Sequence, residues 1–91
     1  MPYRVEIGDQ ADVQVAELDA AIAASVERKI QWLAGNAAAM IHRRLVGMPE
    51  DLAGLCKLRV GDYRILYWVY PPKKLVRIYR IQHRSEVYRQ L

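Results

Sequence analysis

Apolar side chains recur at two different periods along the chain, and the change of period separates a helical part from a strand part. Between residues 9 and 36 they return every three or four residues and form one stripe, as on an amphipathic helix: Val15, Leu18, Ile22, Val26, Ile30 and Leu33. Asp9 and Asp19 are suitable N-terminal caps, and Gly35-Asn36 is a suitable end. The stretch therefore predicts a helical hairpin.

The other apolar positions alternate with polar ones, which is typical of strands. Tyr3–Ile7 predicts a short N-terminal strand, and residues 37–54 predict a connector. Three more strands are expected, over residues 55–60, 63–70 and 75–82. Gly61-Asp62 has the composition of a two-residue hairpin turn, and Pro71–Lys74 makes the next turn. The tail from Ser85 is expected to be a short helix or an irregular end.

The hairpin turn fixes which side chains lie opposite each other. It places Val60 opposite Tyr63 and Arg59 opposite Arg64, and alternation then divides the side chains between two faces. One face collects mainly cations and aromatic rings: Lys57, Arg59, Arg64, Leu66, Trp68, Arg77, Tyr79 and Ile81. The other face is apolar: Leu58, Val60, Tyr63, Ile65, Tyr67, Val69, Val76 and Ile78. We expect the helices to cover the apolar face and to leave the cationic face open.

Arg59 directly opposite Arg64 is the strongest physical indication of function in this pattern. Like charges on adjacent strands destabilise a sheet unless an anion lies between them, so the pair predicts an anion-binding face. Arg80 does not fit, because strict alternation puts it on the helix-covered side. A bulge or the edge of the sheet would have to free it.

The length of the chain, 91 residues, suits a single domain over residues 1–91 with a small core. No apolar run approaches the roughly 18 residues that a membrane span needs, and the first residues lack the apolar segment of a secretory signal. Cys56 is the only cysteine, so no internal disulfide is expected. These features favour a cytoplasmic protein without a membrane partner.

Charge is distributed unevenly along the chain. Residues 1–54 carry five Lys or Arg and eight Asp or Glu, a net charge of −3, whereas residues 55–91 carry nine and two, a net charge of +7. A basic half on a small domain attracts polyanions such as nucleic acid. A solvated cationic surface that only serves solubility is the alternative, and the placement of the cations on one face of the sheet argues against it.

Two segments in the strand part resemble the RelE/ParE superfamily of toxins. Residues 56–67 (CKLRVGDYRILY) are similar to the superfamily's LRVGDYRxxY hairpin, and residues 81–88 (IQHRSEVY) to its HRxxVY ending. Residues 45–49 (LVGMP) resemble its LxGMP connector. The resemblance implies an α+β fold, RelE-like and related to microbial ribonucleases. In it, an N-terminal strand and a helical hairpin pack with an antiparallel sheet in the order β-α-α-β-β-β.

The superfamily contains two activities. RelE-like members cut messenger RNA in the ribosomal A site, and ParE-like members poison DNA gyrase without nuclease residues. The RelE pattern is matched here by Lys57, Arg64, Arg84 and Tyr88. Leu55 stands where relatives have a second strand lysine, and His83 where relatives have a further arginine. The resemblance implies the toxin of a type II toxin–antitoxin pair that acts as a ribosome-dependent endoribonuclease. A gyrase inhibitor on the same fold and a non-enzymatic binding module are the alternatives.

RNA supplies its own nucleophile, the ribose 2′-hydroxyl, so cleavage needs charge stabilisation and proton transfer but no metal or other cofactor. Arg64 is the candidate for holding the scissile phosphate, because its planar fork matches phosphate oxygens. Lys57 and Arg59 would stabilise the developing charge from the same face. Tyr88 and His83 are the candidates for proton transfer, and neighbouring cations would favour the phenolate of Tyr88.

Other residues are given supporting roles or none. Trp68 and Tyr79 are expected to stack on a splayed base, with packing on the sheet as the alternative, and Arg77 to add charge to the binding face. His42-Arg43-Arg44 is interpreted as a solvated connector, and Cys56 as a small core residue.

A site with so few acid–base groups should be weak on free RNA. The first partner implied by the resemblance is therefore the ribosome with its messenger, which would align substrate and toxin. The second is a RelB-like antitoxin, an acidic segment that would fold on residues 9–36 and on the cationic face.

Overall fold

The computed structural model describes residues 2–85, which form two α-helices, five strands and two short 3-10 turns. In chain order these are β1 (Arg4–Ile7), α1 (Asp9–Glu17), α2 (Ala20–Asn36), β2 (Arg43–Arg44), η1 (Glu50–Leu52), β3 (Cys56–Val60), β4 (Tyr63–Tyr70), η2 (Pro71–Lys73) and β5 (Leu75–His83). The predicted helical hairpin and strands are confirmed. Residues 86–91, which include most of the predicted tail, lie outside the described residues.

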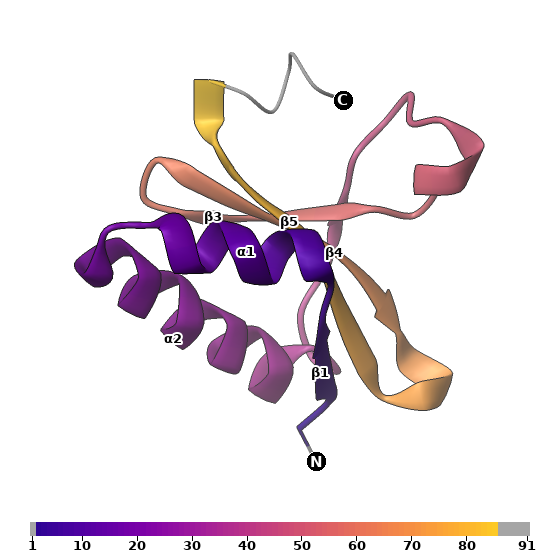
Figure 1. Cartoon of the computed structure of the whole chain (residues 1–91). Helices are drawn as coiled ribbons and strands as arrows, with labels where there is room; N and C mark the ends of the chain where they lie inside the picture. Colours follow the sequence, from indigo (N-terminus) through magenta and orange to yellow (C-terminus); the bar gives the residue numbers. More distant parts are fainter. Residues whose placement is uncertain (1, 86–91) are drawn as a thin grey trace.

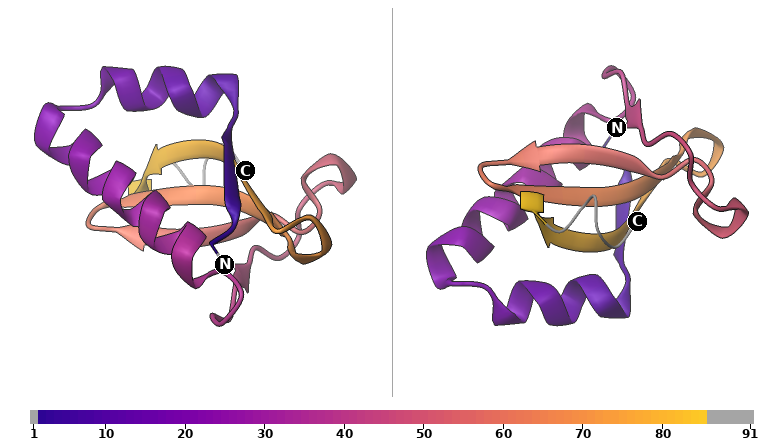
Figure 2. Two further views of the ribbon diagram at one scale, coloured as in Figure 1. Left: turned by 90° about the horizontal axis from the view of Figure 1, so that it is seen from below. Right: turned by 90° about the horizontal axis from the view of Figure 1, so that it is seen from above.

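The strands form one sheet in the order β1-β5-β4-β3-β2 (Figure 1). β3, β4 and β5 are antiparallel neighbours, as predicted, whereas β1 pairs parallel with β5, so the whole sheet is mixed. Figure 2 shows α2 in front of the sheet from one side and the sheet in front of α2 from the other. The helical hairpin therefore covers one face, and the fold class is α+β.

The helical hairpin is held at its bends by capping and by close backbone approach. Asp19 caps α2, because its side chain accepts a hydrogen bond from the Ala21 N–H at 3.2 Å. The predicted cap by Asp9 is wrong, since Asp9 is already helical and Gly8 occupies the capping position. Gly8 donates its N–H to the Ile78 carbonyl at 2.9 Å, and a Cβ at Gly8 would lie only 3.0 Å from that oxygen. The turn into α1 thus needs glycine more than it needs a side-chain cap.

The core lies between the helices and the apolar face of the sheet. Its fully or almost fully buried members include Val26, Ile30, Leu33, Ile65, Tyr67, Val76, Ile78 and Ile81. α1 is also bonded to the sheet, because the Gln14 Oε1 atom accepts the Ile81 N–H at 2.8 Å. That contact lies beyond the end of β1, which pairs with β5 only as far as Ile78.

The strand register agrees with the prediction in the first hairpin and departs from it in the second. Val60 lies opposite Tyr63 and Arg59 opposite Arg64, with Gly61 at a φ of 57° in the turn. Between β4 and β5 the register shifts: Leu66 faces Arg80, whereas Tyr67 faces Ile78. Tyr79 is the extra residue of this bulge, and every later side chain of β5 changes face.

The bulge has two consequences for the predicted faces. Arg80 comes to the cationic face, as a bulge was expected to allow. Ile81 does not lie on that face, contrary to the prediction, because it faces Ile65 and is buried in the core beneath the helices. One inserted residue therefore exchanges an apolar side chain for a cation on the open face.

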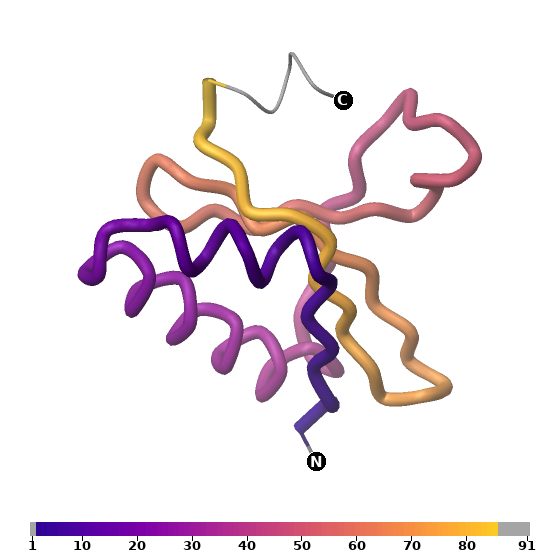
Figure 3. The backbone as a smooth tube through the Cα atoms, viewed as in Figure 1, coloured from indigo at the N-terminus to yellow at the C-terminus, as the bar shows by residue number. Residues whose placement is uncertain are grey.

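The connector 37–54 contains more structure than predicted. Its Arg43–Arg44 pairs with β3 as the edge strand β2, and Glu50–Leu52 forms η1. Figure 3 shows the part around residue 50 as a loop that extends from the sheet. The Trp68 indole N–H fastens this loop by donating to the Ala53 carbonyl at 3.0 Å. Neither of the two described helices is long and apolar enough to cross a membrane.

Candidate functional site

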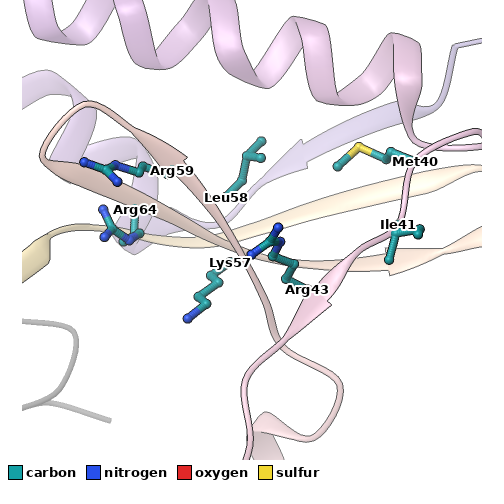
Figure 4. A pocket seen from close by; sticks show the side chains of 7 residues that line it. All are labelled: Met40, Ile41, Arg43, Lys57, Leu58, Arg59 and Arg64. Carbon is teal, nitrogen blue, oxygen red and sulfur yellow. The ribbon is translucent and has the colours of Figure 1, made fainter.

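The β3–β4 hairpin and the edge strand β2 together surround a cavity of about 450 Å³, which we call the cationic cavity. It is lined by Met40, Ile41, Arg43, Lys57, Leu58, Arg59 and Arg64 (Figure 4). Lys57, Arg59 and Arg64 were all predicted to share a site, and the structure brings them together. Leu66, opposite Lys57 on the same face, is fully buried, so this face has an apolar floor next to its cations.

Two cross-strand pairs at the cavity place cation opposite cation. Arg59 faces Arg64, as predicted, and Arg43 faces Lys57. The Arg59 Nε atom donates to the Gly61 carbonyl at 3.1 Å, and an Arg64 Nη atom donates to the Tyr63 carbonyl at 3.2 Å. None of the ion pairs found within residues 2–85 involves these four cations. Their charge is therefore available to an anion from outside.

Arg43 was not predicted to join the site. Its sequence neighbourhood indicates only a solvated connector, and its position depends on the pairing of β2 with β3 across 14 positions of the chain. The pair Arg43-Arg44, in the connector before the strand predicted over residues 55–60, is the one signal in the sequence that could have indicated a role for Arg43. Arg80 is the other cation brought to this face, by the β5 bulge.

The predicted base-binding residues lie elsewhere on the same face. Trp68 and Tyr79 contact each other, with ring centroids 5.2 Å apart, and Trp68 also fastens the loop at Ala53. Arg77 forms an ion pair with Glu6 of β1, with Nε and Oε1 4.0 Å apart. These three residues do not line the cationic cavity. Their contacts are those of packing and of strand pairing.

His83 and Arg84 lie at the tip of the β3–β4 hairpin. His83 is the cross-strand partner of Tyr63 on the helix-covered side, with ring centroids 5.3 Å apart. Its Nδ1 atom accepts the Ser85 N–H at 3.3 Å and lies 2.9 Å from the Ser85 hydroxyl. The Arg84 backbone N–H donates to the Asp62 carbonyl at 2.7 Å, and its Nε lies 3.9 Å from the Asp62 carboxylate. The structure does not bring His83 to the cavity.

Tyr88, the other candidate for proton transfer, lies outside the described residues. Within the described part of the chain, no three His, Cys, Asp or Glu side chains gather in a way that could hold a metal ion.

A buried polar link supports the cavity from behind. The Tyr67 hydroxyl lies 2.7 Å from His42 Nδ1, and His42 Nε2 lies 2.9 Å from the Ala37 carbonyl. A carbonyl can only accept, so Nε2 carries the ring proton and Nδ1 accepts from Tyr67. This link joins the sheet to the end of α2 and fixes the segment that carries Met40 and Ile41 into the cavity. His42 is thus a structural residue rather than part of a solvated connector.

Burial determines the ionisation of the two acidic groups beneath this link. It raises the pKa of the fully buried Tyr67 hydroxyl, and the negative charge that neighbouring Cys56 carries once ionised raises it further. Burial also raises the pKa of the Cys56 thiol, an effect that nearby Arg44 opposes. Cys56 is a thiol donor to the Gly54 carbonyl at 3.3 Å. Both groups are therefore kept neutral, and the burial of Cys56 agrees with its interpretation as a small core residue.

Comparison with known proteins places this chain in a family. The family model for the ParE toxin of type II toxin–antitoxin systems, parDE, matches residues 5–88. Toxin RelG of Mycobacterium tuberculosis is 33% identical over 92 residues, a match that covers 99% of this chain and 100% of that protein.

Solved structures of toxins have the same fold. The toxin–antitoxin complex RelBE2 from Mycobacterium tuberculosis matches with a TM-score of 0.77 and 28% identity, over 93% of this chain and 94% of that chain. The archaeal RelE–RelB complex from Pyrococcus horikoshii OT3 matches with a TM-score of 0.72 and 23% identity, over 96% and 100%. A double mutant of E. coli toxin RelE in the free state matches with a TM-score of 0.72 and 20% identity, over 97% and 90%. The chain therefore belongs to the RelE/ParE superfamily, and it is the toxin of a type II toxin–antitoxin system.

Proposed function

We propose that this toxin is a ribosome-dependent endoribonuclease that cuts messenger RNA in the ribosomal A site and thereby inhibits translation. One observation carries the proposal: Arg59 and Arg64 lie opposite each other, beside Lys57 and Arg43, around one cavity. The described lining of this cavity contains no carboxylate that would neutralise them. Cations held in this way on rigid strands suit the phosphates of a nucleic acid strand.

The reaction begins when the ribose 2′-hydroxyl of the RNA gives its proton to a general base and attacks the adjacent phosphate. A phosphorane with an extra negative charge forms, and the 5′-oxygen then leaves and takes up a proton, which gives a 2′,3′-cyclic phosphate. Arg64 holds the phosphate oxygens with its planar fork, and Lys57 and Arg59 stabilise the charge that develops. These cations are positioned by strand pairing before the substrate arrives, so little reorganisation is needed during the reaction.

Both proton transfers are assigned to Tyr88: its phenolate takes the 2′-hydroxyl proton, and the phenol that results gives a proton to the leaving 5′-oxygen. His83, the other candidate, lies on the helix-covered side of the sheet, opposite Tyr63 and bonded to Ser85. The Tyr88→Phe substitution removes only the hydroxyl and should slow cleavage by about 10²- to 10⁴-fold. His83→Gln should leave cleavage nearly unchanged. If His83→Gln carries the loss and Tyr88→Phe does not, the assignment is reversed.

Two partners follow from this proposal. The ribosome would orient messenger and toxin, an alignment that a site with few acid–base groups needs in order to work. A RelB-like antitoxin would neutralise the cationic cavity with an acidic segment that folds on binding. The RelBE2 and archaeal RelE–RelB structures are toxin–antitoxin complexes, which supports an antitoxin as partner here.

A gyrase inhibitor without nuclease activity is the second candidate, because the family model that matches the chain is that of ParE toxins. One experiment separates the two. The toxin is expressed in growing cells, messenger ends are mapped by primer extension, and supercoiling by purified gyrase is measured with and without toxin. The nuclease proposal predicts new messenger ends at A-site codons and unchanged supercoiling. Inhibited supercoiling with intact messenger would refute it.

A further inference from the structure

A second hollow adjoins the cationic cavity and is not used by the proposed reaction. It lies between α2 and the turn of the β3–β4 hairpin and has a volume of about 510 Å³. We call it the α2 groove. It is lined by Ser25, Arg28, Lys29 and Trp32 of α2 and by residues 59–61.

The α2 side of this groove presents two cations and an aromatic ring on one helical face. Ser25, Arg28, Lys29 and Trp32 follow the three- and four-residue spacing that aligns side chains along a helix. An Arg28 Nη atom donates to the Ser25 hydroxyl at 3.2 Å, and the Lys29 Nζ atom lies 4.3 Å from the centre of the Trp32 ring.

Trp32 does not belong to the core of the protein. The core side of α2 consists of Val26, Ile30, Leu33 and Ala34, whereas Trp32 is 44% exposed. Its ring contacts a lysine cation at the surface. An exposed indole beside two cations offers a flat surface for stacking together with charge for an anion. Packing alone does not require this combination.

The α2 groove and the cationic cavity follow one another along the edge of β3. β2 pairs only with Cys56 and Lys57 of β3. Residues 57–59 line the cavity and residues 59–61 line the groove, so Arg59 belongs to both. At about 3.3 Å per residue, this edge spans roughly 13 Å from residue 57 to residue 61. A polyanion in the cavity can therefore continue into the groove past a cation common to both.

We propose that the α2 groove binds the same RNA strand that enters the cationic cavity, with phosphates at Arg28 and Lys29 and a base stacked on Trp32. The proposal rests on the proposed function for the identity of the strand as RNA. Single-stranded nucleic acid combines a charged backbone with flat bases, which matches both features of the groove. An acidic peptide would use the cations alone.

Binding of a fluorescein-labelled single-stranded oligoribonucleotide, measured by fluorescence anisotropy, tests the groove. Trp32→Ala should weaken binding by about 5- to 150-fold, the range expected for one base stacked on an aromatic ring, whereas Trp32→Phe should retain most of the affinity. The double variant Arg28→Gln/Lys29→Gln should reduce the slope of log Kd against log salt by about 1.4, since each phosphate contact contributes roughly 0.7. Lys73→Gln/Lys74→Gln, at the opposite end of β4, removes two positive charges outside the groove and is the control; it should change neither value.

The assignment of the groove to RNA would be overturned if the wild-type protein did not bind this RNA at low salt, or if both groove variants bound it unchanged. It would also be overturned if the variants lost binding of poly-L-glutamate while RNA binding persisted. The last result would assign the groove to an acidic polypeptide. Cleavage of ribosome-bound messenger is measured separately. If the wild-type protein binds RNA through Trp32 but does not cleave, the nuclease proposal fails and the groove stands.

Discussion

The two faces of the sheet are made from alternate residues of the same strands, yet they follow different rules. On the helix-covered face, Ile65, Tyr67 and Ile78 have no exposed surface and belong to one hydrophobic core. On the other face, Arg59 lies opposite Arg64 at the edge of a cavity. Burial of apolar surface explains the first face, but like charges opposite each other weaken a sheet. The difference indicates that the cationic face serves an anionic ligand at some cost in stability.

The largest expected effect of a substitution lies on the helix-covered face. Ile65→Ala removes a fully buried side chain from the core and should lower the free energy of unfolding by about 2–5 kcal/mol. Urea denaturation followed by circular dichroism measures this loss. Arg64→Ala, one residue earlier and on the other face, is the matched control and should unfold at nearly the wild-type urea concentration. Equal losses of stability in the two variants would show that Arg64 stabilises the fold as much as the buried Ile65 does.

Arg64→Ala should have its effect on activity instead. Removing the group that stabilises the developing charge typically costs roughly 3–4 kcal/mol, or about 10²–10³ in rate. Single-turnover cleavage of a messenger on programmed ribosomes measures it. Arg64→Lys keeps the charge but not the planar fork, so it should recover only part of the rate. Full recovery by lysine would mean that charge alone matters at this position.

Tyr67, on the helix-covered face, should make the protein less stable as the pH becomes alkaline. Burial raises the pKa of its hydroxyl above the unfolded value of about 10. Below that pH the hydroxyl is protonated in both states. Above it, the unfolded chain loses the proton while the folded chain keeps it, so the free energy of unfolding falls as pH rises. Tyr67→Phe should be less stable near neutral pH by about 0.5–1.5 kcal/mol, because the bond to His42 is lost.

The pH dependence of that difference provides the check. Urea unfolding of the wild type and of Tyr67→Phe between about pH 8 and about pH 11 should give two curves that converge, because only the wild type has the Tyr67 contribution. Tyrosines elsewhere in the chain titrate in both proteins and cancel in the comparison. A constant gap across this range would show that Tyr67 titrates normally.

The smallest predicted effect concerns the like-charge pair. Arg59→Gln relieves the repulsion with Arg64 and should leave the melting temperature unchanged or raise the stability by a few tenths to about 1 kcal/mol. Differential scanning calorimetry can resolve a change of this size, with Lys73→Gln as a control for the loss of one exposed positive charge. A clear drop in melting temperature would show that the pair stabilises the fold, and would contradict its role in binding an anion.

The sequence is sufficient to predict those parts of the fold that depend on local patterns. The helical stripe, the cap at Asp19 and the two-residue turn at Gly61 follow from spacing and turn chemistry, and the turn alone fixes Arg59 opposite Arg64. The cap predicted at Asp9 is wrong because close approach of Gly8 to the Ile78 carbonyl decides that turn. This contact joins residues that are distant in the chain.

The candidate site shows the same limit more strongly. Lys57, Arg59 and Arg64 were predicted together because they lie in one hairpin. Arg43 was missed because its place depends on the long-range pairing of β2. Ile81 was placed on the wrong face because alternation cannot reveal a bulge, and the same bulge sets His83 opposite Tyr63, away from the cavity. The proposed role of Tyr88 stays a prediction, since it lies outside the described residues.

The central claim is that the cationic face cuts messenger RNA only when a ribosome presents it. The most direct measurement compares the cleavage rate of one transcript, labelled at its 5′ end, on purified ribosomes with a defined A-site codon and free in solution. We predict rapid cleavage within the A-site codon on the ribosome, little cleavage of the free transcript, and loss of the ribosomal reaction in Arg64→Ala. Equal rates with and without ribosomes, or A-site cleavage that persists in Arg64→Ala, would contradict the account.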